Sequence, residues 1–226
     1  MYEDTLRSEP SPDCPLCPRL HNFIAEWRQR EPAWFNAPVP PFLPQTGVQY
    51  AQLLIIGLAP GLRGANRTGR PFTGDYAGDL LYSTLLSFGF ASGEFQARPD
   101  DGLQLVDTAI VNAVRCVPPE NKPTTEEIRT CRQFLVPVLQ AADARVLVTL
   151  GSIAHQSTVR AYGLKLKDYP FKHALVSQIP NGPALISSYH CSRYNTNTGV
   201  LTTPMFHDVF RKARAIIDEA SGGVEL

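Results

Sequence analysis

The sequence predicts an α/β fold of three layers, in which a central, mostly parallel sheet of four strands lies between two layers of helices. Short apolar runs rich in β-branched residues recur along the chain, and segments with helical spacing separate them. The order of strand, loop and helix repeats, which is typical of a parallel sheet with helices on both faces. The chain has no internal repeat and no low-complexity linker, so we expect one domain over residues 1–226.

Four segments have the pattern of buried strands. The first three are continuous apolar runs, as expected for parallel strands that helices cover on both sides. The fourth is shorter and ends directly at His190. The four segments are residues 53–58, 108–114, 145–150 and 184–189.

Two helices are predicted between the first three strands. Residues 76–88 carry leucines and a phenylalanine at helical spacing. The helix over residues 126–142 starts with the sequence Thr124-x-x-Glu127, which is the pattern of a capping box. The apolar stripe of this second helix includes Cys131.

Two more helices are predicted in the second half of the chain. Ser152 is expected to cap a helix over residues 152–162, and Gly163 is expected to end it. Thr203-Pro204 opens a final helix, because proline is favoured in the first turn and apolar residues then recur at helical spacing.

Composition and charge exclude several classes of protein. Hydrophobic residues make up 43% and charged residues 19% of the chain, which is typical of a globular protein and not of a disordered one. The 21 Lys and Arg balance 21 Asp and Glu, so no overall basic field indicates a polyanionic partner, although a local basic patch remains compatible with this total. No apolar run approaches the about 20 residues of a membrane span, and the first residues lack a secretory signal. We therefore expect a cytoplasmic monomer without a membrane partner.

Four of the five cysteines indicate a metal centre. Two residues separate Cys14 from Cys17. Cys116 lies in a later predicted loop, and Cys131 lies in the predicted helix that follows it. Cytoplasmic thiols stay reduced, and four thiolates bind either zinc or an iron–sulfur cluster. Only the first pair has the short spacing usual in zinc sites, so the spacing favours a [4Fe-4S] cluster over zinc. The remaining alternative is that Cys116 and Cys131 are ordinary buried cysteines.

The loops that follow the predicted strands are the expected place for a ligand. In sheets of this kind ligands bind beyond the carboxyl ends of the strands. Residues 59–75 form a long glycine-rich loop there, whose backbone N–H groups could stabilise an anion or a leaving group. The loop has neither the Gly-Lys-Ser/Thr of a P-loop nor a dinucleotide-binding fingerprint. The other three loops are residues 115–123, 151–152 and 190–199.

Charged and aromatic side chains in the first loop have two interpretations each. Arg63, Arg67 and Arg70 are candidates to contact phosphates, and the alternative is that they are solvated charges. Phe72 is a candidate platform for a flat ring, and the alternative is an ordinary core phenylalanine.

Three motifs and the four cysteines resemble the iron–sulfur uracil-DNA glycosylases, most of all their family 5 (UDGb-type) branch. The first motif, residues 57–75, contains Gly-Leu-Ala-Pro and Asn-Arg-Thr-Gly-Arg-Pro-Phe-Thr-Gly-Asp. The second, residues 111–119, reads Val-Asn-Ala-Val-Arg-Cys-Val-Pro-Pro, and the third, residues 188–192, reads Ser-Tyr-His-Cys-Ser. The clustered cysteines fall where that family has its cluster ligands, and the resemblance extends over most of the chain.

This resemblance implies a uracil-DNA glycosylase-like fold, a [4Fe-4S] cluster, and hydrolysis of the N-glycosidic bond of uracil in DNA during base excision repair. Hypoxanthine and other deaminated bases are further candidate substrates, and the damaged nucleotide would be flipped out of the duplex. Related family 4 enzymes have an acidic residue where this chain has Leu58. That difference favours an alternative, a nucleic-acid-binding iron–sulfur protein of the same fold without chemistry. Hydrolysis of a free nucleoside is a third hypothesis, which the arginines of the first loop disfavour.

The resemblance also implies how the base is bound. Phe72 would stack on the flipped base, and Asn112 would bind its Watson–Crick edge; the alternative for Asn112 is a turn cap. Backbone N–H groups of the segment that contains Leu58, Ala59 and Gly61 would meet the departing carbonyl.

Asp75 and His190 are the catalytic candidates that the resemblance implies. Asp75 is the carboxylate that the family 5 branch is proposed to use, and its alternative role is the N-cap of the helix that follows; the two roles are compatible. His190 would donate to the negative charge that develops on the base oxygen, for which a neutral imidazole suffices. Its alternative is a histidine whose hydrogen bonds are satisfied at the strand end.

The loop after His190 supplies the remaining candidates. Arg193, Tyr194 and Asn195 are expected to contact phosphates or to fill the gap that the flipped base leaves. Cys191 stands where the family usually has proline, and we expect it to be neither a metal ligand nor a nucleophile.

Overall fold

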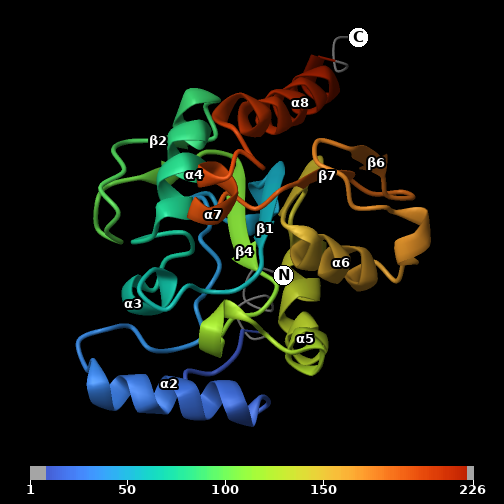
Figure 1. Cartoon of the computed structure of the whole chain (residues 1–226). Coiled ribbons are helices and arrows are strands. Elements are labelled where there is room, and N and C mark those ends of the chain that lie inside the picture. Colours follow the sequence, from blue (N-terminus) through green and yellow to red (C-terminus); the bar gives the residue numbers. More distant parts are fainter. Residues whose placement is uncertain (1–8, 223–226) are drawn as a thin grey trace.

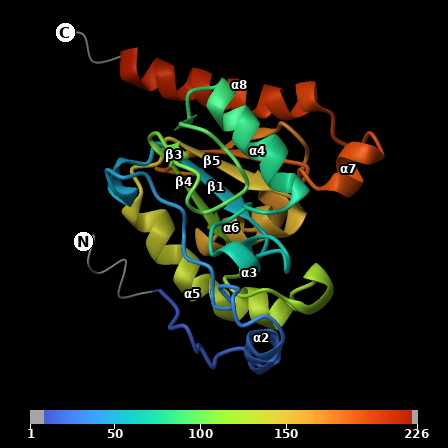
Figure 2. The same cartoon turned by 90° about the vertical axis from the view of Figure 1, so that its left-hand side faces the viewer.

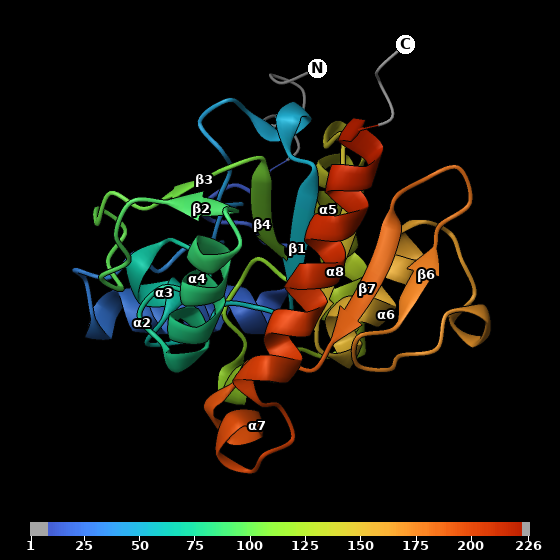
Figure 3. The same ribbon diagram turned by 90° about the horizontal axis from the view of Figure 1, so that it is seen from above.

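The computed structural model describes residues 9–222, and its centre is a sheet with the strand order β4-β1-β5-β7-β6 (Figures 1 and 3). The four predicted strands are all present and parallel: β1 (Leu53–Gly57), β4 (Thr108–Asn112), β5 (Val146–Leu150) and β7 (Ala184–Ser188). The predicted number of strands was one too low, because β6 (Val176–Gln178) pairs antiparallel with β7 at the sheet edge. This strand has only three residues, is partly exposed and lacks the apolar run of a buried strand.

Helices cover both faces of the sheet, which confirms the three layers (Figure 2). On one face α4 (Tyr76–Ser87) and α8 (Thr203–Gly222) pack on the strands through apolar side chains. On the other face α5 (Thr125–Ala141) and α6 (Ser152–Ala161) do the same. The expectation of a single domain stays a prediction. Within the described part of the chain, no helix combines the length and the apolar character that crossing a membrane requires.

Short elements complete the described chain. They were not predicted, because two to five residues are too few for a hydrophobic period to show. The helix α2 (Pro18–Arg30) was not predicted either, although it has 13 residues. It has no side-chain cap and begins directly after Cys17. The short elements are the helices α3 (Ala65–Thr68) and α7 (Arg193–Asn197), the 3₁₀ turns η1 (Val48–Tyr50), η2 (Pro119–Asn121) and η3 (Leu166–Asp168), and the paired strands β2 (Ala91–Ser92) and β3 (Gln104–Leu105).

Two of the predicted helix caps had different outcomes. The capping box of α5 is confirmed: Thr124 N–H donates to the Glu127 carboxylate (2.7 Å), and Glu127 N–H donates to the Thr124 hydroxyl (3.2 Å). The predicted Ser152 cap is wrong, because α6 begins at Ser152 and its N-cap is Gly151. Gly151 has φ +96°, a left-handed conformation that glycine adopts without strain, so the chain enters α6 without a capping side chain.

The strand order defines where a ligand can bind. From β1 the chain first adds β4 on one side and then β5 on the other, so the order of the sheet reverses at β1. A crevice is expected at the carboxyl ends of the strands at such a switch point. Gly57 and Asn112, the last residues of β1 and β4, are direct neighbours there.

Candidate active site

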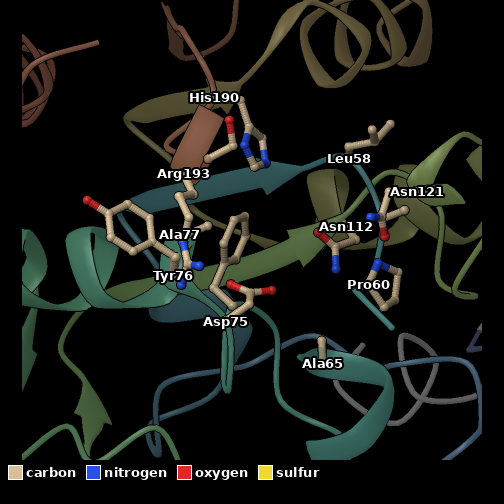
Figure 4. A pocket seen from close by; sticks show the side chains of 14 residues that line it. Leu58, Pro60, Ala65, Asp75, Tyr76, Ala77, Asn112, Asn121, His190 and Arg193 are labelled. Carbon is tan, nitrogen blue, oxygen red and sulfur yellow. The ribbon is translucent and has the colours of Figure 1, made fainter. Parts of the chain in front are cut away.

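A cavity of about 530 Å³ opens at this switch point, and Figure 4 shows its lining. The Asp75 carboxylate and Arg193 lie on one side, and Asn112 and Asn121 lie opposite. The lining is mostly apolar with a few convergent polar groups, the composition expected of a site for a small organic group. It consists of Leu58, Ala59, Pro60, Gly61, Ala65, Phe72, Asp75, Tyr76, Ala77, Asn112, Asn121, His190, Ser192 and Arg193.

Asn112 presents a buried amide to the cavity. Its side chain is only 3% exposed, and its Oδ1 has no hydrogen-bond partner within residues 9–222. A buried polar atom without a partner is costly, and such atoms are rare in proteins. The amide therefore has both a donor and an acceptor available for a bound ligand, which argues against the alternative of a turn cap.

Phe72 forms an aromatic wall next to this amide. The residue is buried, and its backbone is left-handed (φ +52°), a conformation that costs a non-glycine residue about 1–2 kcal/mol. Its ring centroid lies 6.2 Å from that of His190, with the two planes tilted by 31°. Strain of this kind at a cavity wall is common where a side chain is held for function.

Asp75 combines the two roles that the sequence suggested. As the N-cap of α4, its carboxylate accepts a hydrogen bond from Gly78 N–H (3.3 Å). Its Oδ2 also lies against the backbone of the first loop, where a β-carbon at Gly64 would come within 2.4 Å of it. Burial raises the pKa of the Asp75 carboxyl, and the N–H groups of Gly78 and Ala77 partly offset this shift. The carboxylate is therefore more basic than an exposed aspartate.

His190 lies at the end of β7 with an unpaired ring. Neither ring nitrogen has a hydrogen-bond partner among the residues that the structure describes, so the alternative of a satisfied histidine does not apply. Burial lowers the pKa of His190, which keeps the imidazole neutral at neutral pH. Its backbone carbonyl accepts a hydrogen bond from the Asn195 side-chain amide (2.8 Å). Asn195 thus holds the loop of His190, and one of its two Nδ2 hydrogens is used in this bond.

The first loop supplies free backbone donors. Within residues 9–222, the N–H groups of Leu58, Ala59 and Gly61 donate no hydrogen bond. Two of the three carbonyls, in contrast, are engaged: that of Leu58 accepts from Val114 N–H (2.9 Å), and that of Gly61 accepts from the start of α3. The loop is therefore fixed through its acceptors while its donors remain available at the cavity, an arrangement that suits a developing negative charge.

The predicted DNA contacts fall into two groups. Arg63, Arg67 and Arg193 are exposed and have no acidic partner within the described chain, and Tyr194 is 74% exposed on α7. The guanidinium of Arg193 lies 5.3 Å from the centre of the Tyr76 ring at the edge of the cavity. These four side chains can reach a polyanion.

Arg70 cannot, and its assignment as a DNA contact is wrong. It is 6% exposed, and each nitrogen of its guanidinium is used inside the protein. Nε donates to the Thr73 hydroxyl (2.7 Å), while Nη1 and Nη2 donate to the Asp101 carboxylate (2.8 and 2.7 Å). Sequence spacing placed Arg70 with the other loop arginines, but it did not reveal this partner 31 residues later.

Asn121 and Tyr76 are two polar residues of the cavity wall among those that the sequence does not predict as site residues. Asn121 lies in η2 with φ +57°, and Tyr76 is the first residue of α4. Asn121 belongs to residues 115–123, one of the loops where the sequence predicts a ligand, and an asparagine close to prolines is the signal that the sequence offers.

The four clustered cysteines gather between α2, α5 and the loop after β4. Burial raises the pKa of the Cys116 thiol, and the neighbouring thiols of Cys131, Cys14 and Cys17 raise it further, which reflects their proximity. Apolar side chains of α2 and of the loop after β4 surround the group. Within residues 9–222, no set of three or more His, Cys, Asp or Glu side chains is placed to hold a metal ion.

Other contacts fix α2 and α5, the helices beside this group of cysteines. Arg19 of α2 donates from Nε (2.8 Å) and Nη2 (2.7 Å) to the carboxylate of Glu127 on α5. The backbone N–H of Arg115 donates to Sγ of Cys131 (3.2 Å). Cys191 lies apart and is fully buried, where its thiol contacts the Ala77 carbonyl (3.5 Å).

Comparison with known proteins identifies the family. A family model described as "Uracil DNA glycosylase superfamily" matches residues 44–214. The chain belongs to this superfamily. The matched range contains every cavity residue as well as Cys116 and Cys131, while Cys14 and Cys17 precede it.

Type-5 members of the uracil-DNA glycosylase superfamily align with nearly the whole chain. The Type-5 uracil-DNA glycosylase of Thermus thermophilus is 42% identical over 90% of this chain and 93% of its own length. That of Mycobacterium leprae is 38% identical over 90% and 91%, respectively. The Type-4 uracil-DNA glycosylase of Archaeoglobus fulgidus, at 34% identity, covers only 55% of each chain. The resemblance to the superfamily is thereby confirmed, and its Type-5 members match this chain over a greater length than this Type-4 member.

Proposed function

We propose that this protein hydrolyses the N-glycosidic bond between uracil and deoxyribose in DNA, as a step of base excision repair. The observation that carries the proposal is the convergence on one cavity of the Phe72 ring, the unpaired Asn112 amide, the Asp75 carboxylate and the neutral His190. The relatives that align over 90% of this chain are Type-5 uracil-DNA glycosylases, which supports the same activity.

Recognition of the base follows from the groups that are available. Uracil presents an N–H donor next to a carbonyl acceptor on its Watson–Crick edge, and the Asn112 amide can pair with both. The Phe72 ring provides a face for stacking, which is worth about 1–3 kcal/mol per base. Hypoxanthine presents the same donor and acceptor pair, so we propose it as a second substrate. The base must leave the helix stack to reach this cavity.

Bond cleavage leaves an anionic base and a cationic sugar, and the cavity has a group for each. His190 and the free N–H groups of the loop at Leu58 would donate to the carbonyl oxygen of the departing base. Asp75 would orient a water molecule for attack on the sugar carbon and stabilise its positive charge. Leu58 itself offers no carboxylate, so Asp75 is the acidic side chain among the residues that line the cavity.

A cleavage assay tests this proposal. Duplexes that differ only in carrying uracil, hypoxanthine or thymine at one position are incubated with the protein and then treated with alkali, which breaks the strand at abasic sites. Strand breaks in the uracil duplex and none in the thymine duplex are expected. Tight binding of the uracil duplex without any breaks would instead support the alternative of a binding protein without chemistry.

We further propose that the four cysteines bind a [4Fe-4S] cluster. Four neighbouring thiols in an apolar shell, with a backbone N–H aimed at one sulfur, suit such a cluster. Cys14, Cys17, Cys116 and Cys131 would each supply one thiolate to the cluster. When bound, the cluster would cross-link α2, α5 and the loop after β4. The cavity residues already account for the hydrolysis.

The cellular setting is a proposal too. We propose a monomer in the cytoplasm, where thiols remain reduced. The exposed large apolar side chains within residues 9–222 come from separate segments of the chain, which supports a monomer. Light scattering of the purified protein tests this, and a mass of twice 24.9 kDa would contradict it.

A further inference from the structure

Arg70 lies under the turn that carries Phe72. Its Nε donates to the Thr73 hydroxyl (2.7 Å), so one side chain spans the turn from residue 70 to residue 73. The Thr73 hydroxyl in turn donates to the Pro71 carbonyl (3.2 Å). Pro71 and Thr73, the residues before and after Phe72, are therefore both held by these contacts.

Asp101 holds the other end of Arg70. Its carboxylate is fully buried and accepts both Nη groups in the two-pronged geometry that arginine favours. It also accepts from the backbone N–H groups of Gln96 (2.9 Å) and Leu103 (3.1 Å). Although burial opposes ionisation, the bonds from Arg70, Gln96 and Leu103 keep the pKa of Asp101 below its ordinary value. The pair is therefore charged, and it ties the loop between β2 and β3 to the Phe72 turn.

Three aromatic rings surround the same guanidinium. Its centre lies 5.2 Å from the ring of Phe42, 5.5 Å from that of Tyr82 and 5.8 Å from that of Phe95. A cation within about 6 Å of an aromatic ring is attracted to its face. Tyr82 adds a second tie, because its hydroxyl donates to the Pro71 carbonyl (2.5 Å).

The turn over residues 70–73 is strained at Phe72, the residue that faces the cavity. Phe72 has φ +52°, and its carbonyl lies so close to α4 that a β-carbon at Gly78 would come within 1.9 Å of it. A turn with this strain persists only where its surroundings fix it. The side chains of Arg70, Asp101 and Tyr82 hold this turn in place from outside the cavity.

We propose that the Arg70–Asp101 pair, inside its aromatic cage, is a positioning device that sets the Phe72 ring for stacking on the flipped base. The proposal rests on the proposed function, because it assigns Phe72 to base stacking. Arg70 and Asp101 do not line the cavity, so both act through Phe72 and neither contacts the substrate.

Three variants test the device at increasing severity. Tyr82→Phe removes the hydrogen bond from the Tyr82 hydroxyl to the Pro71 carbonyl. Asp101→Asn removes the negative charge that faces Arg70. Arg70→Lys keeps the positive charge but removes the guanidinium that donates to both oxygens of Asp101. We expect Arg70→Lys and Asp101→Asn to lower the single-turnover rate on a uracil duplex about 10- to 100-fold, because small displacements of a positioning group have effects of this size. Free uracil should bind each of them more weakly by a similar factor. Affinity for a uracil-free duplex should stay unchanged.

The matched control is Arg214→Lys. Arg214 also lies over an aromatic ring, that of Phe90 (3.9 Å), and donates to the Phe88 carbonyl (2.9 Å), but it lies on α8 away from the cavity. It should lower the melting temperature without changing uracil affinity.

Two outcomes would overturn the device. The first is that the Arg70 and Asp101 variants have lower melting temperatures but keep the wild-type single-turnover rate and uracil affinity when assayed well below those temperatures. The other is a loss of uracil affinity in the Arg214 control as large as theirs. Uracil binding is measured without turnover, so it decides the role of Arg70 even if the wild type cleaves no DNA, a result that would contradict the proposed function instead.

Discussion

The side-chain oxygen of Asn112 lies directly against the backbone of Gly57, so closely that a β-carbon at Gly57 would approach it to 2.3 Å. The two residues are register partners at the ends of β1 and β4. The Phe72 ring occupies the same space from the other side, since its Cζ would lie 2.7 Å from that β-carbon. The absence of a side chain at Gly57 therefore lets the amide and the aromatic ring share one wall of the cavity.

Replacing Gly57 by alanine should displace both groups. We expect Gly57→Ala to lower the single-turnover rate about 100-fold and the free energy of unfolding by about 1–3 kcal/mol, because an added methyl in a packed site forces its neighbours to move. Gly163→Ala is the control: Gly163 has φ +70° but open space around it, so alanine strains the backbone far from the cavity. This control should lose stability and keep its rate. Equal rates in both variants would show that Gly57 has no special role.

Asp75→Asn should separate catalysis from stability. An asparagine caps α4 as well as aspartate does, so the helix remains, while the carboxylate that orients water is lost. Burial raises the Asp75 pKa in the folded state, so the wild type loses stability as pH rises from about 3.8 through that raised value. At pH 7 the variant should therefore be at least as stable as the wild type, and the difference should vanish in acid. Denaturant unfolding at several pH values, together with single-turnover rates, measures both effects.

His190→Ala should lower the rate without shifting its dependence on pH. Removing one donor to a developing negative charge commonly costs about 100-fold or more in rate. Burial lowers the pKa of His190, so its ring stays neutral above that pKa and sets no limit at neutral pH. The acid limb of the rate profile should instead follow Asp75, with activity falling as pH drops through its raised pKa. An acid limb that moves in His190→Ala would contradict this division of roles.

The five cysteines should divide into four ligands and one bystander. Alanine at Cys14, Cys17, Cys116 or Cys131 should remove the broad visible absorption of an iron–sulfur cluster and lower the melting temperature. Cys191→Ala is the matched control, since Cys191 is buried like Cys116 and Cys131 but contacts Ala77 at the start of α4, and it should keep the colour. A colourless, fully active wild type that contains zinc would refute the cluster.

The exposed arginines should set the salt dependence of DNA binding. Each phosphate contact that is lost reduces the slope of log K against log salt by about 0.9. We expect that change for Arg63→Ala, Arg67→Ala and Arg193→Ala, measured by titration of a uracil-free duplex at several salt concentrations. Arg70→Lys should leave the slope unchanged, because its guanidinium is enclosed by Asp101 and three aromatic rings. A reduced slope in Arg70→Lys would show that Arg70 does reach the DNA.

Predictability differed between elements for physical reasons. The strands β1, β4, β5 and β7 were predictable because burial on both faces demands continuous apolar runs. The three-residue β6 was not predictable, since an edge strand with partly exposed side chains needs no such run. Asp75 and His190 were predicted as site residues because the motifs at residues 57–75 and 188–192 resemble those of a known family. Asn121 escaped because a single asparagine in a turn has no distinctive pattern.

The fold class, the family resemblance and most of the cavity residues were predictable from the sequence, because periodicity and motif order are properties of the chain. The role of each loop arginine became evident only in the folded chain. Arg63 and Arg70 look alike in the sequence, yet only Arg70 meets the buried carboxylate of Asp101, which comes from a distant loop. The tertiary structure also placed Gly57 beside Asn112 and left the Asn112 amide unpaired. Burial and pairing depend on contacts between segments far apart in the chain, and local sequence patterns do not encode such contacts.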